Sequence, residues 1–246
     1  MRSREMRCVR RMRAAGGKVM KGGRGAIVHE ERILFEPLRG IEWLRHCFTT
    51  RKFMDSCAPG KGGRIELCRR LRDEQFPDAR AVVWGEQVHG TGIATIGGAP
   101  AGGMVEMPGV DALICGEPGV CLVAYGADCP IVYIADVKKK VIALVHSGRA
   151  GSEKRIVAAC VGRMGREFGT APADCVVAIS PSIGPCCYPA DLWQSIEQEC
   201  HTTGIGSLVN AEMCTACQPG LFFSYRREKS RCGRMLGAMM VTTGKS

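Results

Sequence analysis

The chain has 246 residues, of which 46% are hydrophobic and 24% are charged, which is the composition of a soluble protein with a substantial core. The net charge of +10 would suggest a nucleic-acid partner, but nine of the 34 Lys and Arg residues and only one of the 24 acids fall in residues 1–25. That segment therefore carries +8 and the rest of the chain +2. The near-neutral body argues against nucleic acid, and no apolar run approaches the roughly 20 residues that cross a bilayer.

The basic segment 1–25 has no apolar run and is not a secretory signal. Its Arg-rich, acid-poor composition is typical of a mitochondrial presequence or a nucleic-acid-binding arm. We favour a simpler interpretation, in which it is a disordered extension or follows an upstream start codon, with Met20 as the alternative start. The sequence thus predicts an extension over 1–25 and one domain over 26–246.

The apolar pattern predicts alternating strands and helices. Arg64–Phe76 has helical spacing, and Ile156, Cys160, Met164 and Phe168 form a stripe that Gly169 should end. We expect Ser152 to cap this second helix. The predicted elements in chain order are a short strand and turn within 26–50, a loop at 55–63, the helix Arg64–Phe76, strand Ala81–Trp84, a loop at 97–103, strands Ala112–Cys115, Val120–Tyr125, Ile131–Ala135 and Val141–Val145, the striped helix, strand Cys175–Ile179, helix Asp191–Cys200, and a late strand Leu221–Tyr225. Short, continuously apolar strands are typical of a layered α/β protein in which both sheet faces are buried.

Three side chains stand out as candidate metal ligands. His89 follows a predicted strand, Cys129 lies between two strands, and His146 ends another. Two imidazoles and one thiolate are what zinc takes when a fourth position stays open for chemistry, whereas structural zinc sites usually close with four protein ligands. We therefore predict a catalytic zinc site at His89, Cys129 and His146.

The fifteen cysteines form no regular framework. Their odd number and the lack of a secretory signal favour a reducing cytoplasm over disulfides. Cys214 and Cys217 form a CxxC motif, but the chain has no second CxxC, and the adjacent Cys186 and Cys187 are poor joint ligands. The sequence therefore favours one metal site rather than two.

Several motifs together carry a family resemblance. In chain order they are Phe48–Arg51, Trp84–Gly90, Asp111–Ile114, Ala127–Pro130, Ala143–Gly148, Ile183–Tyr188, Cys214–Thr215, Phe222–Arg227 and Gly233–Arg234. This series resembles the YfiH family, also called the laccase-domain or polyphenol oxidase family. The resemblance implies a single-domain layered sandwich of the α/β/β/α type.

The resemblance also implies an activity. Members of this family resemble zinc-dependent purine nucleoside phosphorylases that act on adenosine, inosine and methylthioadenosine, with adenosine deamination as a side activity. The expected small-molecule partners are a purine nucleoside and phosphate, and Arg51 is the candidate cationic or orienting group near the phosphate. Asp128 is expected to serve the turn. The chain is expected to be a monomer or a homodimer.

Other interpretations stay open. A thiolate paired with a histidine is also a nucleophile with its base, so Cys129 and His146 would suit an amide or peptidoglycan-editing hydrolase. Multicopper oxidation is disfavoured because the five histidines include no His-x-His pair, although copper can bind such a site adventitiously.

Departures from the family pattern leave a third interpretation open, an inactive metal-binding homologue. The stretch His146–Gly151 lacks the family's tryptophan and displaces its arginine. Residues 52–54 replace the family's paired glycines, and the stretch between Cys200 and Cys214 is shorter than the family pattern, which predicts the loss of a helix and a strand.

Overall fold

Two sheets stacked face to face form the centre of the computed structural model, which describes residues 20–21, 25–55, 63–100 and 103–244. Within these residues the larger sheet has eight strands in the order β1-β2-β3-β4-β14-β9-β5-β7. They are β1 (Met20–Lys21), β2 (Ala26–Val28), β3 (Arg32–Phe35), β4 (Leu44–Thr49), β14 (Met235–Val241), β9 (Val120–Gly126), β5 (Ala81–Gly85) and β7 (Met104–Met107). The smaller sheet has six, in the order β13 (Ser207–Asn210), β12 (Cys175–Ile179), β10 (Ile131–Asp136), β11 (Val141–His146), β8 (Ala112–Cys115) and β6 (Ile93–Ile96).

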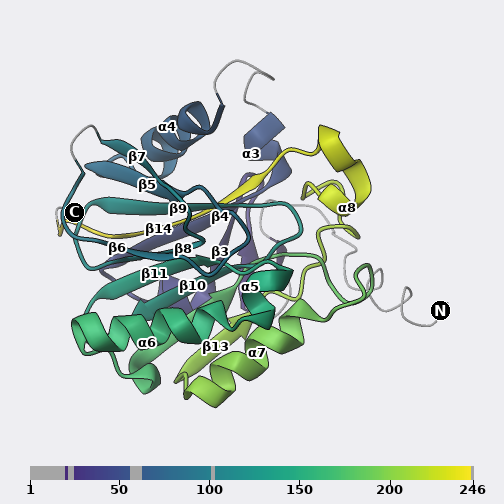
Figure 1. Cartoon of the computed structure of the whole chain (residues 1–246). Coiled ribbons are helices and arrows are strands. Elements are labelled where there is room, and N and C mark those ends of the chain that lie inside the picture. The colour runs from purple at the N-terminus through teal and green to yellow at the C-terminus, as the bar shows by residue number, and fades with distance from the viewer. Residues whose placement is uncertain (1–19, 22–24, 56–62, 101–102, 245–246) are drawn as a thin grey trace.

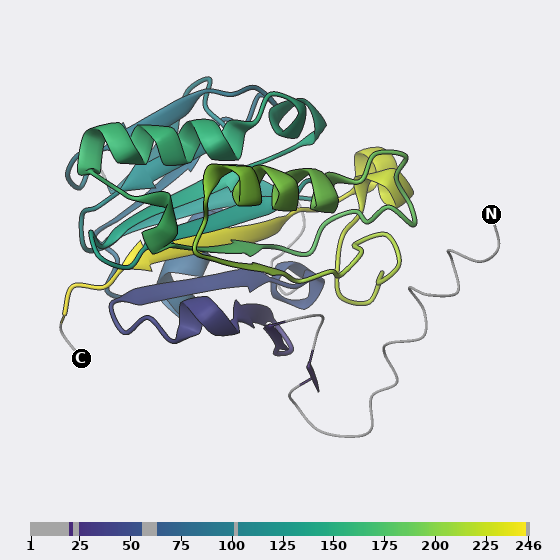
Figure 2. The same cartoon turned by 90° about the horizontal axis from the view of Figure 1, so that it is seen from below.

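Helices cover the outer faces of both sheets (Figures 1 and 2). The helices of the described residues are α2 (Glu36–Arg39), α3 (Arg51–Asp55), α4 (Gly63–Gln75), α5 (Arg149–Glu153), α6 (Ile156–Phe168), α7 (Leu192–Thr203) and α8 (Tyr225–Glu228), with short turns η1 (Pro172–Asp174) and η2 (Lys229–Arg231). Helix α4 lies on the larger sheet, and α6 and α7 lie on the smaller one. The predicted α/β/β/α sandwich is therefore confirmed.

Three apolar clusters join the four layers. Phe48 and Tyr133 are fully buried between the sheets. The close approach of the two sheets there requires glycine, because a Cβ at Gly237 would lie 2.6 Å from the Tyr133 hydroxyl. Cys68 and Leu71 of α4 are buried against the outer face of the larger sheet. The stripe of α6 is buried against the smaller sheet, as its four-residue spacing predicts.

The apolar strands are the best predicted elements. Strands β8 and β12 have the predicted bounds, and β5, β9, β10 and β11 differ from prediction by one residue at one end. Helix α6 ends at Gly169, whose φ of 70° is the left-handed C-cap that glycine adopts at least cost. Helix α7 begins after Asp191, whose side chain accepts a hydrogen bond from the Gln194 N–H.

Two local predictions are wrong. Ser152 does not cap α6, because Arg155 adopts a left-handed φ of 57° there and separates α6 from α5; the Ser152 hydroxyl instead contacts the Ser147 hydroxyl at 2.8 Å. Leu221–Tyr225 is not a strand. Phe222 and Phe223 are buried from a loop, so their burial needs no strand, and Ser224 caps α8.

The ends of the chain and the loops add detail to the predicted organisation. Strand β1 pairs with β2, so a first strand lies within the segment predicted as an extension; residues 1–19 and 22–24 lie outside the described residues. Most of the loop at 55–63 and part of that at 97–103 also lie outside them. Segment 26–50 contains three strands rather than one, and the short stretch after Cys200 still forms β13.

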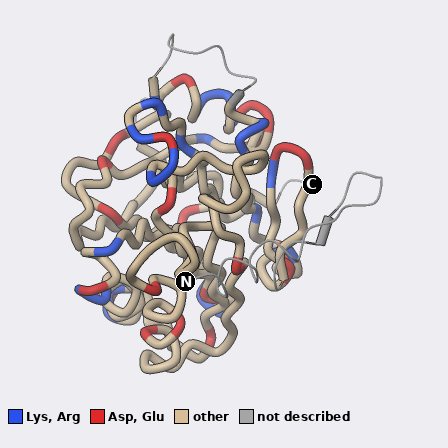
Figure 3. The backbone as a smooth tube through the Cα atoms, turned by 90° about the vertical axis from the view of Figure 1, so that its right-hand side faces the viewer, with Lys and Arg blue, Asp and Glu red and all other residues tan. Residues whose placement is uncertain are grey.

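The surface charge is mixed. In Figure 3, Lys and Arg are interspersed with Asp and Glu over the described chain rather than gathered on one face, as expected from the near-neutral body. No helix among the described residues is long and apolar enough to cross a membrane.

One edge of the sandwich collects the chain crossings between the sheets. Strands β5, β7 and β9 run parallel in the larger sheet, and each is followed by a strand of the smaller sheet. The three crossings therefore leave the same edge. Strand β11 runs antiparallel to β8 and β10, so its last residue returns to that edge. Strands β12 and β13 end there as well.

Candidate active site

The three predicted ligands meet at this edge. His89 lies in the crossing after β5, Cys129 in the crossing after β9, and His146 is the last residue of β11. Their ligand atoms all lie within 4.8 Å of one another. The Cys129 Sγ is 3.9 Å from the His89 Nε2, and the two imidazole rings are 4.9 Å apart at an angle of 84°.

Asp111 holds both histidines in place, and the sequence analysis assigned it no role. It lies in the crossing after β7 and is buried. Its carboxylate accepts hydrogen bonds from the backbone N–H groups of His89 (3.0 Å) and Gly90 (2.7 Å), and its Oδ1 is 2.8 Å from the His146 Nδ1. A carboxylate on one imidazole nitrogen turns the other nitrogen toward a metal. The sequence signal that could have pointed to this role is that Asp111 directly precedes the apolar strand β8.

The loop that carries His89 is held in an unusual backbone conformation. Gln87 and His89 have φ values of 58° and 59°, a region that non-glycine residues rarely occupy. The Gln87 side chain clamps the end of β9, because its amide donates to the Tyr125 carbonyl at 2.8 Å and accepts from the Tyr125 N–H at 2.7 Å. Gly148 closes the other side of the site. A Cβ there would lie 3.1 Å from the His89 Cδ2 and 3.2 Å from the Cys129 Sγ.

The three ligands alter one another's ionisation. Burial raises the pKa of Cys129, but hydrogen bonds and charge from His146 and His89 outweigh it and lower this pKa to about 6. Burial lowers the pKa of His146, whereas Asp111 and Cys129 raise it to about 9. Burial also opposes ionisation of Asp111, yet its hydrogen bonds from His146 and the backbone hold its pKa below the ordinary value. The metal-free site therefore favours a thiolate beside an imidazolium.

We expect this thiolate to be reactive once metal is removed. With a pKa of about 6, Cys129 is mostly ionised at about pH 7, so iodoacetamide should alkylate it near its maximal rate there and more slowly as the pH falls through about 6. Cys232 is the internal control, because burial raises the pKa of its thiol. Peptide mass spectrometry over about pH 5 to 8 measures both rates. A Cys129 rate that rises only at the alkaline end, like that of Cys232, would contradict the assignment.

A pocket of about 670 Å³ opens beside the three ligands. Its lining includes all three together with apolar and aromatic side chains that include Ile183, Tyr188, Leu192 and Tyr225. The lining also contains five cations, which are Arg64, Arg149, Arg226, Lys229 and Arg234. One lining acid is present, Asp128, so the pocket suits an anionic ligand with an apolar part.

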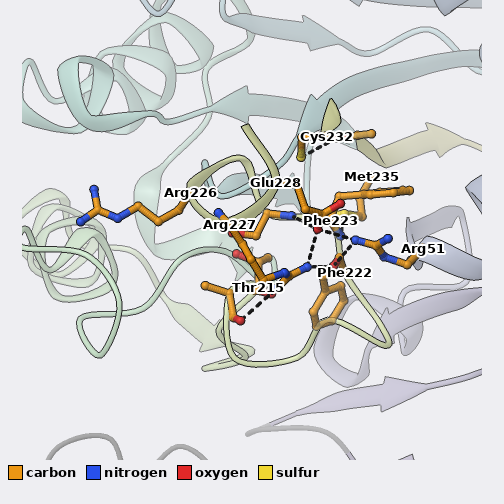
Figure 4. A network of polar contacts seen from close by, with 12 residues as sticks. Arg51, Thr215, Phe222, Phe223, Arg226, Arg227, Glu228, Cys232 and Met235 are labelled. Atoms are coloured by element: carbon orange, nitrogen blue, oxygen red, sulfur yellow. Dashed lines mark hydrogen bonds and ion pairs between the residues drawn. The ribbon is translucent and has the colours of Figure 1, made fainter. Parts of the chain in front are cut away.

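The lining cations differ in whether an acidic side chain pairs with them. Arg64 pairs with Glu106 at 2.7 Å and Arg149 with Glu153 at 2.8 Å. Within the part of the chain that the structure describes, Arg226 and Lys229 have no acidic partner within ion-pair distance. The Arg226 guanidinium lies 5.7 Å from the centre of the Tyr188 ring and extends away from the neighbouring polar network (Figure 4). Arg226 is therefore the cation best placed to meet a ligand's charge.

Arg51 is placed differently from the other predicted site residues. It does not appear in the pocket lining; its guanidinium pairs with Glu228 and lies 4.1 Å from the centre of the Phe223 ring (Figure 4). Glu228 belongs to α8, the helix that carries Tyr225 and Arg226 into the pocket. Arg51 thus binds α8, the helix that carries part of the pocket wall, and does not itself line the pocket.

Asp128 serves the turn, as expected. Its carboxylate accepts hydrogen bonds from the Thr215 hydroxyl and from the Arg226 N–H, both at 2.6 Å. These bonds tie the crossing that carries Cys129 to the first turn of α8. Both carboxylate oxygens of Asp128 are thus engaged within the protein, one of them by the backbone of Arg226.

The donor set fits a resident metal ion. Two histidines and one cysteine, with one imidazole oriented by a buried carboxylate, match the ligands of zinc at an open site. The same donors also accept copper. His46 does not extend the set, because it is buried and its Nε2 accepts a hydrogen bond from the Phe35 N–H at 2.8 Å.

Comparisons with known proteins identify the family and agree with the fold. A family model described as multi-copper polyphenol oxidoreductase laccase matches residues 64–190 and 189–242. A purine nucleoside phosphorylase of Bacteroides thetaiotaomicron is 30% identical over 268 residues, which cover 88% of this chain and 98% of the relative. The purine nucleoside phosphorylase YlmD of Geobacillus stearothermophilus is 30% identical over 61% of this chain and 69% of its own.

Solved structures show the same fold. The crystal structure of YlmD from Geobacillus stearothermophilus has a TM-score of 0.75 and 25% identity, covering 87% of this chain and 97% of that one. The crystal structure of the hypothetical protein YfiH from Bacillus licheniformis has a TM-score of 0.74 and 23% identity, covering 86% and 97%. The family model matches well over half of the residues. The chain therefore belongs to the YfiH-like, laccase-domain family.

Proposed function

We propose that the protein is a zinc-dependent purine nucleoside phosphorylase that acts on adenosine, inosine and methylthioadenosine, with adenosine deamination as a side activity. The observation that carries the proposal is the convergence of His89, Cys129 and His146 on a pocket that combines lining cations with an apolar wall. The purine nucleoside phosphorylase names of the relatives support it.

In phosphorolysis a phosphate oxygen forms a bond to C1′ of the ribose while the bond from C1′ to the purine nitrogen breaks. The products are ribose 1-phosphate and the purine base, which takes up a proton. Arg226 and Lys229 would neutralise the phosphate, and Arg149 lies near them in the lining. The side chains of Tyr188, Tyr225 and Leu192 would provide an apolar wall for the base.

His89, Cys129 and His146 would hold the zinc, and Asp111 would keep His146 oriented. A zinc ion held there would supply Lewis-acid chemistry beside the bound substrate. We assign Arg51 an orienting role, because its pairing with Glu228 holds α8 and so the Arg226 backbone. Its effect on phosphate would then be indirect.

The test is phosphate dependence. Purified protein should release adenine from adenosine with phosphate present and not without it. Arg226→Ala should raise the KM for phosphate about tenfold or more, because a charge-assisted hydrogen bond contributes roughly 1.5–3 kcal/mol. Arg166→Ala is the matched control, since Arg166 is exposed on α6, outside the pocket lining, and its variant should keep the wild-type KM.

Two outcomes would oppose the proposal. Adenine release that is independent of phosphate would show hydrolysis instead of phosphorolysis. A folded, metal-loaded protein that turns over no purine nucleoside would favour an inactive homologue.

The low pKa of Cys129 favours one second candidate, an amide or peptidoglycan hydrolase. The Cys129 thiolate, adjacent to His146 and His89, has the features of an activated nucleophile. This chemistry would survive metal chelation and end with thiol alkylation. Phosphorolysis that depends on the metal would instead end with chelation.

A further inference from the structure

Two turns bring together a second group of cysteines, none of which is in the pocket lining. Cys186 and Cys187 lie in the turn after β12, and Cys214 and Cys217 lie in the turn after β13. Their four sulfur atoms all lie within 4.8 Å of one another. The Cys217 Sγ is 3.5 Å from the Cys186 Sγ and 3.4 Å from the Cys187 Sγ. The adjacent pair therefore does converge, against the expectation from sequence.

The distances between the four sulfur atoms suit a metal ion with tetrahedral coordination. Four thiolates at about 2.3 Å from zinc would lie about 3.8 Å from one another, which is close to the observed separations. A disulfide bond would need about 2.05 Å between two sulfurs. The chain thus presents four thiols at the separations of a closed, four-ligand site rather than those of a disulfide pair.

The backbone around Cys214 is arranged to receive a thiolate. Its Sγ accepts a hydrogen bond from the Gly184 N–H at 3.3 Å, so the turn that carries Cys186 and Cys187 supports a sulfur of the other turn. A single bridge between Ser182 and Cys214 fixes the register of the two turns.

We propose that Cys186, Cys187, Cys214 and Cys217 form a structural zinc site with four thiolate ligands, separate from the His89, Cys129 and His146 group. Zinc is the metal that closed four-cysteine sites commonly hold. The connection between Cys187 and Cys214 includes α7 and β13, so the ion would close a long loop.

The site would hold the pocket wall. Thr215, inside the CxxC motif, donates its hydroxyl to Asp128, and the Ile183 N–H donates to the Asp128 carbonyl at 2.8 Å. Asp128 is next to Cys129 in the chain, and Ile183 and Tyr188 line the pocket. Fixing the two turns to each other therefore fixes one wall of the pocket against the crossing that carries Cys129.

Metal content of the full chain tests this inference without any activity measurement. Protein purified under reducing conditions from zinc-supplemented cells should contain two zinc ions per chain by elemental mass spectrometry. His146→Ala should retain one, and Cys217→Ser in the wild-type background should also retain one. Cys232→Ser is the matched control, because that cysteine is half-buried in the same region but outside the cluster, and it should retain two.

A spectroscopic measurement serves if the cysteine variants fail to fold. His146→Ala reloaded with cobalt should show the intense visible absorption of tetrahedral cobalt with thiolate ligands. One zinc ion in the wild type and none in His146→Ala would overturn the inference. A disulfide between the two turns in protein handled without air would overturn it as well. Because none of these readouts uses a nucleoside, failure here is distinct from failure of the proposed function.

Discussion

Cys129→Ala is expected to empty the site formed with His89 and His146 and to abolish phosphorolysis. The variant removes the only thiolate of the group and leaves two imidazoles, one of them exposed. Loss of an outer partner of a metal ligand alone commonly costs 10–100-fold, so loss of a ligand should cost at least about 100-fold in kcat/KM. Zinc content and phosphate-dependent adenine release, measured on the same preparation, check this. His146→Ala should give the same result.

Cys232→Ala is the control for a general effect of losing a thiol. Cys232 lies before β14 and outside the cluster of ligands, so its variant should keep the metal and the activity of the wild type. Full activity in Cys129→Ala or His146→Ala would end the zinc proposal. Activity that survives loss of the metal but not alkylation of Cys129 would favour the Cys-His hydrolase.

Asp111→Asn should weaken both zinc binding and turnover by about 10–100-fold. The wild-type carboxylate accepts hydrogen bonds from two backbone N–H groups and lies beside the His146 Nδ1. The three donor–acceptor distances are 3.0 Å or less. An asparagine has the same shape, but it has one acceptor oxygen and turns an N–H toward donors. His146 would lose its orientation, and the loop at His89 and Gly90 would lose part of its anchor. Competition with a chelator measures zinc affinity, and kcat/KM reports turnover.

Asp136→Asn separates this role from the general cost of changing a buried acid. Asp136 is fully buried at the opposite end of β10 from the site, and its carboxylate accepts from the Lys138 and Lys139 N–H groups at 2.9 Å. Its variant should lower the melting temperature and leave zinc affinity unchanged. Wild-type zinc affinity and turnover in Asp111→Asn would show that the carboxylate does not orient the ligands.

Local sequence patterns predicted the short apolar strands that are bounded by turn residues. Strands β8 and β12 are short, and turn residues on both sides mark their ends. Strand β8 is buried along its whole length, and β12 is buried except at Val176. The continuous apolar run of β14 carries the same signal, although no strand was predicted there; it lies between β4 and β9 in the larger sheet. The strand predicted at Leu221–Tyr225 was wrong because a buried apolar run need not pair with another strand in a sheet.

The types of ligand, their position after apolar strands and the layered α/β class were all determined by the sequence alone, because each depends on residue chemistry or on short-range periodicity. Tertiary structure decided the rest. Whether His89, Cys129 and His146 meet depends on the crossings after β5 and β9, which leave one edge of the larger sheet, and on the return of β11 to that edge. This arrangement joins residues that are far apart in the sequence. The same arrangement makes Asp111 a partner of His146 and brings four cysteines from two turns within reach of one ion. Contacts of that kind follow from the pairing of whole sheets, and no window along the chain contains them.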